Sequence, residues 1–224
     1  MTANKNGYTL VELLVGLAMA SVVMTAIFIS YQAQVKGKIS QDSALDMQQA
    51  GRAGLELVSA DIRMAGCDPT AIAGAGIITA DAEEFRFTMD ITGGGDTLNE
   101  SDGKLESAGE DVRYALSGGG DFVRERFLNG VSDGGEQPLI ENVDAVNFVY
   151  LDQNGVVTAT PEDIRQVELA IVVRSGDQIR AFQRGYTDST TYRNLRGDVI
   201  LDPQDDKFSR ILLTTSVYCR NMGR

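Results

Sequence analysis

The chain has 224 residues and a formal net charge of −12, from 20 lysines and arginines against 32 aspartates and glutamates. Such a balance offers no basic surface for nucleic acid, and the absence of histidine removes the commonest general base and metal ligand. Two cysteines, Cys67 and Cys219, are too few for a disulfide-rich scaffold and lack zinc or redox spacing. We therefore expect a protein that is not an enzyme and holds no metal.

An apolar segment from Tyr8 to Ile29 follows a short polar start. As a helix its 22 residues would span roughly 33 Å, enough to cross a bilayer. Glu12 is its single charge, and an acid at the centre of a membrane helix costs about 2.5 to 3.5 kcal/mol on insertion scales, so a functional role is expected. A secretory signal peptide is shorter and ends at small residues. A plain membrane anchor explains the length but not Glu12.

The segment KNGYTLVELLVGLAMAS, residues 5–21, resembles the prepilin signature of type IV pilin-like proteins. That signature is a polar leader ending in glycine, an aromatic residue, Thr-Leu-x-Glu and an apolar helix; Phe is commoner than Tyr8 after the glycine. The resemblance implies that a prepilin peptidase cuts between Gly7 and Tyr8 and that the new amino group of Tyr8 is methylated. It also implies that Glu12 pairs with the cationic N-terminus of a neighbouring subunit and sets the register of the helices.

Beyond the apolar segment the helical pattern continues and becomes amphipathic. The glycines Gly51 and Gly54 would let this part approach a sheet closely, and Gly66 followed by Asp68-Pro69 would end the helix. The alternative is a break near residues 36–38. The side chains expected to bury along one face are Ala44, Gln48, Gly51, Leu55, Val58, Ile62 and Ala65.

After residue 74 short alternating segments separated by glycine-rich turns predict an antiparallel sheet, so the fold class is α+β with a pilin-like architecture. Turns are expected at residues 117–120 and at Asn154-Gly155. The expected strands are Gly76–Thr79, Glu84–Ile91, Asp111–Leu116, Phe122–Phe127, Val143–Leu151, Ile164–Arg174 and Arg210–Tyr218. The expected regions are a leader at 1–7, a transmembrane and filament-core helix at 8–31, an amphipathic stem helix at 32–66 and a β-rich head at 67–224.

Four further segments resemble narrower families. Residues 48–69 and 210–221 are similar to the helix-to-head junction and the terminal strand of PilW-type minor pilins, whereas residues 138–155 and 164–175 are similar to J-type minor pseudopilins of type II secretion. The first resemblance implies a minor pilin that helps to initiate a type IV pilus near its tip. The second implies a secretion pseudopilin. A membrane-anchored enzyme or binding domain is the remote alternative.

The resemblance also implies where the protein works and with what. It places the head in the periplasm while the helix is anchored in the bacterial inner membrane, and later at the cell surface in the filament. The implied partners are the major pilin, other minor pilins, the prepilin peptidase, the inner-membrane assembly platform and a tip adhesin.

Two features of the head remain open. An oxidising periplasm would permit a disulfide between Cys67 and Cys219, and two buried thiols are the alternative. Acidic, glycine-rich segments at 92–110 and 132–136, with Asp202, Asp205 and Asp206, are read as solvated flexible loops. Calcium binding is the alternative, although none has the spaced ligands of a recognisable calcium loop. We expect no cofactor.

Overall fold

The computed structural model describes residues 9–92, 101–176 and 187–223. Within a described helix, the side chains of residues 39 and 40 are not placed. Contacts divide the chain into two compact units, residues 1–43 and residues 44–224. The second part of the predicted stem thus belongs to the same compact unit as the head.

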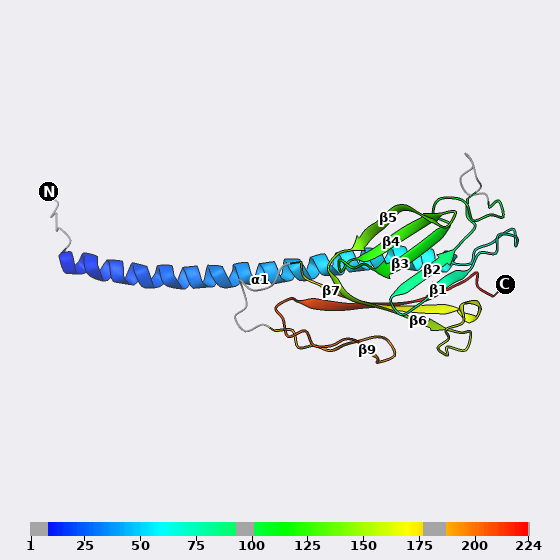
Figure 1. Cartoon of the computed structure of the whole chain (residues 1–224). Coiled ribbons are helices and arrows are strands. Elements are labelled where there is room, and N and C mark those ends of the chain that lie inside the picture. Colours follow the sequence, from blue (N-terminus) through cyan, green and yellow to red (C-terminus); the bar gives the residue numbers. More distant parts are fainter. Residues whose placement is uncertain (1–8, 93–100, 177–186, 224) are drawn as a thin grey trace. The chain divides into compact units, whose positions relative to one another are not determined.

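The helix α1 runs from Leu10 to Met64 without interruption (Figure 1). It is helical through residues 36–38, so the alternative of a break there is wrong. Gly66 ends it as expected, because its φ of +72° is unfavourable for side chains with a Cβ and because its N–H donates to the Thr88 carbonyl at 2.9 Å.

The head contains two main antiparallel sheets. The first has the order β1-β2-β3-β4-β5 and the second the order β10-β7-β6. The first sheet comprises β1 (Ile77–Ala80), β2 (Glu84–Thr88), β3 (Asp111–Leu116), β4 (Phe122–Leu128) and β5 (Val131–Ile140). The second comprises β6 (Val143–Leu151), β7 (Gln166–Arg174) and β10 (Arg210–Tyr218). The remaining elements are the short helix η1 (Pro161–Asp163) and the pair β8 (Tyr192–Arg193) and β9 (Val199–Leu201).

All seven expected strands are present, but the reading of residues 132–136 as a flexible loop is wrong. They belong to β5, which pairs with β4 through two register shifts. Two adjacent glycines, Gly134 and Gly135, make this segment look like a turn in the sequence, and in the irregular strand both have positive φ. The short strands β8 and β9 were not expected either.

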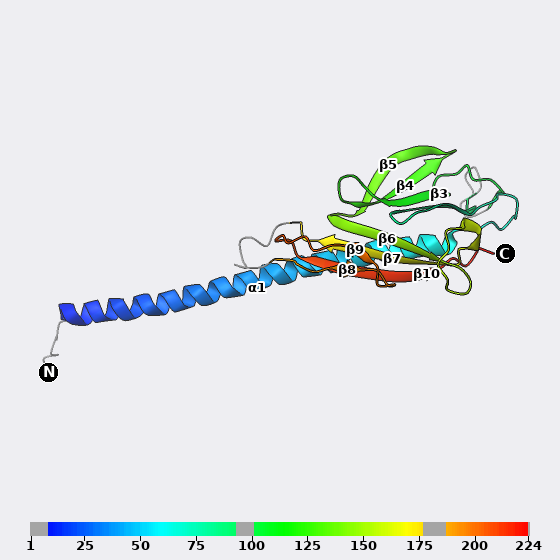
Figure 2. The same ribbon diagram turned by 60° about the horizontal axis from the view of Figure 1, so that its bottom comes forward.

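The buried face of α1 meets both sheets. Gly51 contacts Leu213 and Val173 of the second sheet, and Gly54 lies against Ile140 at the end of β5. Figures 1 and 2 show this part of α1, coloured cyan, running along the head strands. Six aromatic rings fill the core with neighbouring centroids 5.0–6.4 Å apart: Phe85, Phe87, Tyr114, Phe122, Phe148 and Tyr150.

One residue of the predicted helix face is wrong. Gln48 is exposed, and Met47 is buried in its place. Met47 precedes Gly51 by four residues and therefore lies one helical turn before it on the same face of α1. Gly51, Leu55, Val58, Ile62 and Ala65 are buried as expected, whereas Ala44 is only half-buried.

The segment from residue 187 to residue 209 covers the outer face of the second sheet. Tyr192 packs there with Ala145 and Val172. Arg210 of β10 holds this segment in place, because its side chain is only 2% exposed and forms ion pairs with Asp188 and Asp206 of the segment and with Asp144 of β6. The acidic cluster around residue 206 thus includes a carboxylate that binds an arginine.

Candidate functional site: the exposed apolar helix

The first part of α1 exposes a long series of mostly apolar side chains. Every residue from Thr9 to Gln34 is exposed. The helix contains an 18-residue window with a mean hydropathy of 2.3, and by length and composition it can cross a membrane. Soluble proteins rarely expose a large continuous apolar surface, which usually marks contact with a membrane or a partner.

Thr9 caps the start of this helix. Its hydroxyl oxygen accepts the Glu12 N–H at 3.3 Å, and its carbonyl accepts the Leu13 N–H at 3.2 Å. These bonds satisfy amides that a helix start otherwise leaves without partners. Sequence reasoning missed this role of Thr9, although the Thr-x-x-Glu spacing is that of a capping box.

Glu12 lies on the first turn of α1, exposed among leucines and valines. None of the ion pairs formed by the described residues includes it. The partial positive charge of the helix start favours an acid here, but a neutralising cation has to come from elsewhere. Gly7 and Tyr8, the expected cleavage and methylation residues, lie outside the described part of the chain.

Two hydroxyl groups within the apolar segment, those of Ser21 and Thr25, are satisfied internally. The Ser21 hydroxyl donates to the Ala18 carbonyl at 2.7 Å, and the Thr25 hydroxyl donates to the Ser21 carbonyl at 2.8 Å. Such bonds remove the cost of placing a hydroxyl in an apolar surrounding. Glu12 is therefore the one charged group of the segment 9–34 that needs a partner.

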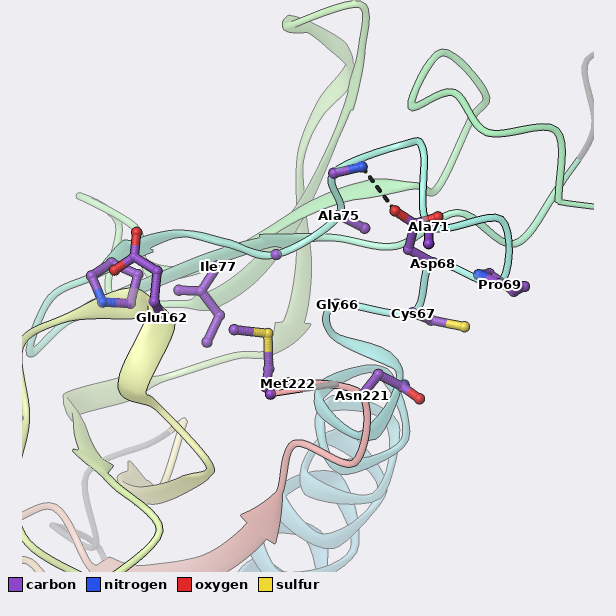
Figure 3. A pocket seen from close by; sticks show the side chains of 14 residues that line it. Gly66, Cys67, Asp68, Pro69, Ala71, Ala75, Ile77, Glu162, Asn221 and Met222 are labelled. Atoms are coloured by element: carbon purple, nitrogen blue, oxygen red, sulfur yellow. Dashed lines mark hydrogen bonds between the residues drawn. The ribbon is translucent and has the colours of Figure 1, made fainter.

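A second feature is a pocket of about 770 Å³ at the end of α1 in the head (Figure 3). It lies between the loop after the helix, η1 and the C-terminal segment, with Cys67, Ile77, Glu162 and Met222 in its wall. The Asp68 carboxylate accepts the Gly74 N–H at 2.8 Å and so shapes the loop. Desolvation acts to raise the pKa of Asp68, but this bond and those from Thr70 and Ile72 hold it below its ordinary value.

The Asp68 carboxylate thus holds the loop that follows the helix. Over the described residues, no group of three or more histidine, cysteine, aspartate or glutamate side chains is placed to hold a metal ion.

Two buried carboxylates organise part of the acidic segment 92–110. Asp90 accepts the N–H groups of Asp102 and Gly103, and Glu110 accepts those of Ile91, Thr92 and Ser107. Both acids are fully buried. The described part of this segment is thus fixed by hydrogen bonds at its base, while residues 93–100 lie outside the description.

Both cysteines belong to the head core. Cys219 is buried and Cys67 packs against the same cluster. Burial raises the pKa of the Cys219 thiol to about 12, although the positive charge of Arg165 opposes this rise. The Asn221 amide donates to the Arg63 carbonyl at 3.1 Å, so the C-terminal segment lies beside the end of α1. The disulfide between Cys67 and Cys219 stays a prediction.

Comparison with known proteins agrees with these features. Residues 2–28 match the model of the prokaryotic N-terminal methylation motif. The fold is similar to that of a type IV-like pilin, TTHA1219 from Thermus thermophilus, with a TM-score of 0.55 and 12% identity over 79% of this chain and 98% of that one. No curated protein shows significant sequence similarity. The chain thus combines a prepilin methylation motif with a type IV pilin-like fold.

Proposed function

We propose that the protein is a minor pilin of the PilW type, processed by a prepilin peptidase and active in the initiation of a type IV pilus near its tip. One observation carries the pilin part of this proposal: a capped, exposed apolar helix has a single acid on its first turn, within a methylation motif. The PilW type and the place near the tip rest on the resemblance of residues 48–69 and 210–221. A structural role follows, because the site supplies a surface for packing and a charge for alignment. It does not supply the parts of a catalytic centre.

The apolar segment would have two successive surroundings. In the inner membrane its side chains contact lipid, and in the filament they contact the helices of other subunits. Each large apolar side chain kept from water stabilises either state by about 1.5 to 3 kcal/mol. The hydrophobic contribution to the free energy therefore changes little when the helix moves from lipid into a helix bundle. Apolar packing alone therefore does not fix the axial position of one helix against the next.

Glu12 would supply that position. Cleavage after Gly7 creates a cationic amine at Tyr8, and the amine of a neighbouring subunit can neutralise Glu12. At a separation of about 4 Å, with an effective dielectric constant of about 20, the attraction is about 4 kcal/mol. A helix displaced along the bundle loses this pair and leaves a charge in an apolar surrounding, which disfavours other registers.

The head would remain in the periplasm until assembly and then lie on the outside of the filament. Its implied partners are other minor pilins, the major pilin, the assembly platform and a tip adhesin. A J-type pseudopilin of type II secretion would use the same site. Deleting the gene and measuring both surface pili and the secretion of folded proteins distinguishes the two, since loss of pili alone supports the pilus assignment.

The direct test replaces Glu12 by alanine and by glutamine. We expect mass spectrometry to find both variants cut before a methylated Tyr8, while their incorporation into sheared filaments falls strongly. Asp46→Asn is the matched control, because it removes an exposed acid further along the same helix. Full incorporation of Glu12→Ala would contradict the alignment role. A functional wild-type protein that retains residues 1–7 would contradict the prepilin assignment, as would a Gly7 variant that works uncleaved.

A further inference from the structure

The edges of the two head sheets differ in how well they are protected. An exposed edge strand offers unpaired N–H and C=O groups to other chains, and proteins usually block it with bulges, prolines, charges or short length. In the first sheet, β1 has only four residues, and β5 carries two register shifts and Pro138. Both edges of this sheet are therefore poor templates for another strand.

In the second sheet, the edge at β6 is also protected. A register shift separates Val143 from Ala145. Its main chain is used by other parts of the head, since the Val143 N–H donates to the Gly120 carbonyl, the Phe148 N–H to the Ala82 carbonyl and the Thr158 N–H to the Tyr150 carbonyl.

The opposite edge, β10, has none of these protections. Its nine residues pair with β7 in one unbroken register, and residues 211–218 contain no charge, proline or glycine. Figure 2 shows β10, coloured red, at the margin of its sheet. It is a long, regular and uncharged edge.

The register shows which main-chain groups are available. The Ser175 N–H donates to the Ser209 carbonyl and the Cys219 N–H to the Arg165 carbonyl, each at 2.8 Å. Because main-chain groups alternate in direction along an antiparallel pair, odd-numbered residues of β10 face β7 and even-numbered ones face outward. The outward groups belong to Leu212, Thr214, Ser216 and Tyr218, and no described residue hydrogen-bonds to them.

A shallow groove of about 370 Å³ follows this edge. Its walls are the Arg52, Glu56 and Arg63 side of α1 and residues 214 and 215 of β10. These three charged side chains are exposed and form no ion pair with any described residue. The groove therefore has an excess of one positive charge on a chain whose net charge is −12.

We propose that β10 is a docking edge for an extended strand of a partner protein that carries two acidic side chains facing α1. Arg52 and Arg63 are 11 residues apart, which is about three helical turns and about 16 Å along one face. A strand covers that distance in about five residues, and its side chains return to one face every second residue. The two acids are thus four or six residues apart.

A second copy of this chain fits the edge less well. Its own β10 brings no acid between residues 211 and 218, and its groove would add two more arginines to the contact. A strand from another protein can satisfy the outward main-chain groups and both arginines together. Main-chain pairing then gives affinity, and the acidic pattern gives specificity.

The test uses the full chain in detergent micelles and a labelled nine-residue peptide of threonine and valine with glutamate at its second and sixth positions. We expect binding by fluorescence anisotropy and slower amide exchange at residues 212, 214, 216 and 218. A peptide with lysine at those two positions, or with glutamates at the second and fifth positions on opposite faces, should bind about tenfold more weakly or less.

One pair of variants and one double variant separate main-chain from charge effects. Thr214→Pro removes an outward N–H and should lose about tenfold or more in affinity, whereas Thr214→Ala keeps that N–H and should stay within about twofold. If Thr214→Pro does not fold, the double variant Arg52→Gln/Arg63→Gln provides the test. It should lower the affinity for the acidic peptide without lowering the affinity for the lysine peptide.

Several results would overturn the proposal. They are absence of peptide binding, protection at strands other than β10, equal binding of the lysine peptide, and a concentration-dependent dimer that protects β10 in sedimentation and exchange measurements. None of these measurements depends on cleavage or filament formation. The docking edge and the pilus assignment can therefore fail independently.

Discussion

Asp61 of α1 and Arg124 of β4 form an ion pair in which the Asp61 Oδ2 lies 3.0 Å from both Nε and Nη2 of the guanidinium. The Tyr114 hydroxyl donates to the same oxygen at 2.6 Å. Burial, followed by the Asp61 charge, raises the pKa of Tyr114 well above its ordinary value, so the hydroxyl keeps its proton. This cluster joins the helix to the first sheet through groups largely removed from water.

Replacing Asp61 by alanine should lower the free energy of unfolding of the head by about 2 to 3 kcal/mol, because it leaves a half-buried arginine and a buried hydroxyl without their acceptor. Tyr114→Phe removes only one donor and should cost about 1 kcal/mol. Urea denaturation followed by circular dichroism measures both. Equal effects of the two variants would mean that the ion pair contributes little.

Gly54→Ala should destabilise the head although alanine favours a helix. A Cβ at this position would lie 2.5 Å from the Ile140 Cγ1 and 3.5 Å from the Leu139 Cγ. Overpacking costs about 1 to 3 kcal/mol, which exceeds the gain of about 1 kcal/mol in helix propensity. The midpoint of thermal unfolding should fall. Gly37→Ala is the control, because nothing lies within 4 Å of its added Cβ, and it should leave the midpoint unchanged or slightly higher.

The Arg210 cluster should make stability depend on acid pH. The hydrogen bond from Arg210, opposed by desolvation, holds the pKa of Asp206 below its ordinary value of 3.8. A lowered pKa stabilises the folded state above that ordinary value, and the contribution is lost as the pH falls through the lower folded value. At pH values below 3.8 the urea concentration at the midpoint of unfolding should therefore decrease. Carboxyl titration by NMR should give Asp206 a lower pKa than that of an exposed aspartate.

Arg210→Met tests the source of this dependence. It leaves Asp144, Asp188 and Asp206 without their shared cation, so stability near pH 7 should fall by about 3 to 5 kcal/mol. The pKa of Asp206 should move upward. Arg126→Met is the control, because its pair with Asp133 is long, at 3.9 Å, and about half exposed, so it should cost no more than about 0.5 kcal/mol.

The cysteine pair gives a prediction about oxidation. We expect protein isolated from the periplasm to contain the Cys67–Cys219 disulfide, which closes a long loop and would stabilise the head by about 4 to 5 kcal/mol in the chain-entropy model. Non-reducing electrophoresis should show a faster band that Cys219→Ser abolishes. After reduction, Cys219 should resist alkylation at pH 8 until the protein is unfolded, because burial raises the pKa of its thiol to about 12. Two titratable thiols in the unreduced, denatured protein would contradict the disulfide.

Local pattern was enough to predict the helix, most strands and the lone acid. Alternation and turn residues give each of the expected strands, and the position of Glu12 needs only the surrounding apolar residues. The assignment failed at β5, where Gly134 and Gly135 look like a turn but are held as a strand by pairing with β4. Pairing of this kind depends on the neighbouring strand, which a local pattern does not include.

Contacts between distant residues could not be predicted either. Asp188 looks like one of many surface acids, yet it is 4% exposed because it binds Arg210 and Tyr192. Likewise the free edge at β10 depends on the order of the strands in the sheet. Only the folded chain shows which strand ends the sheet and which charges of α1 lie beside it.

Thr9 sets the first helical residue at Leu10, three positions after the expected cleavage bond. The two hydrogen bonds that Thr9 accepts from Glu12 and Leu13 do not involve residues 1–7. Cleavage before Tyr8 would therefore leave this cap in place, so that the uncut and the mature protein present Glu12 on the same first helical turn.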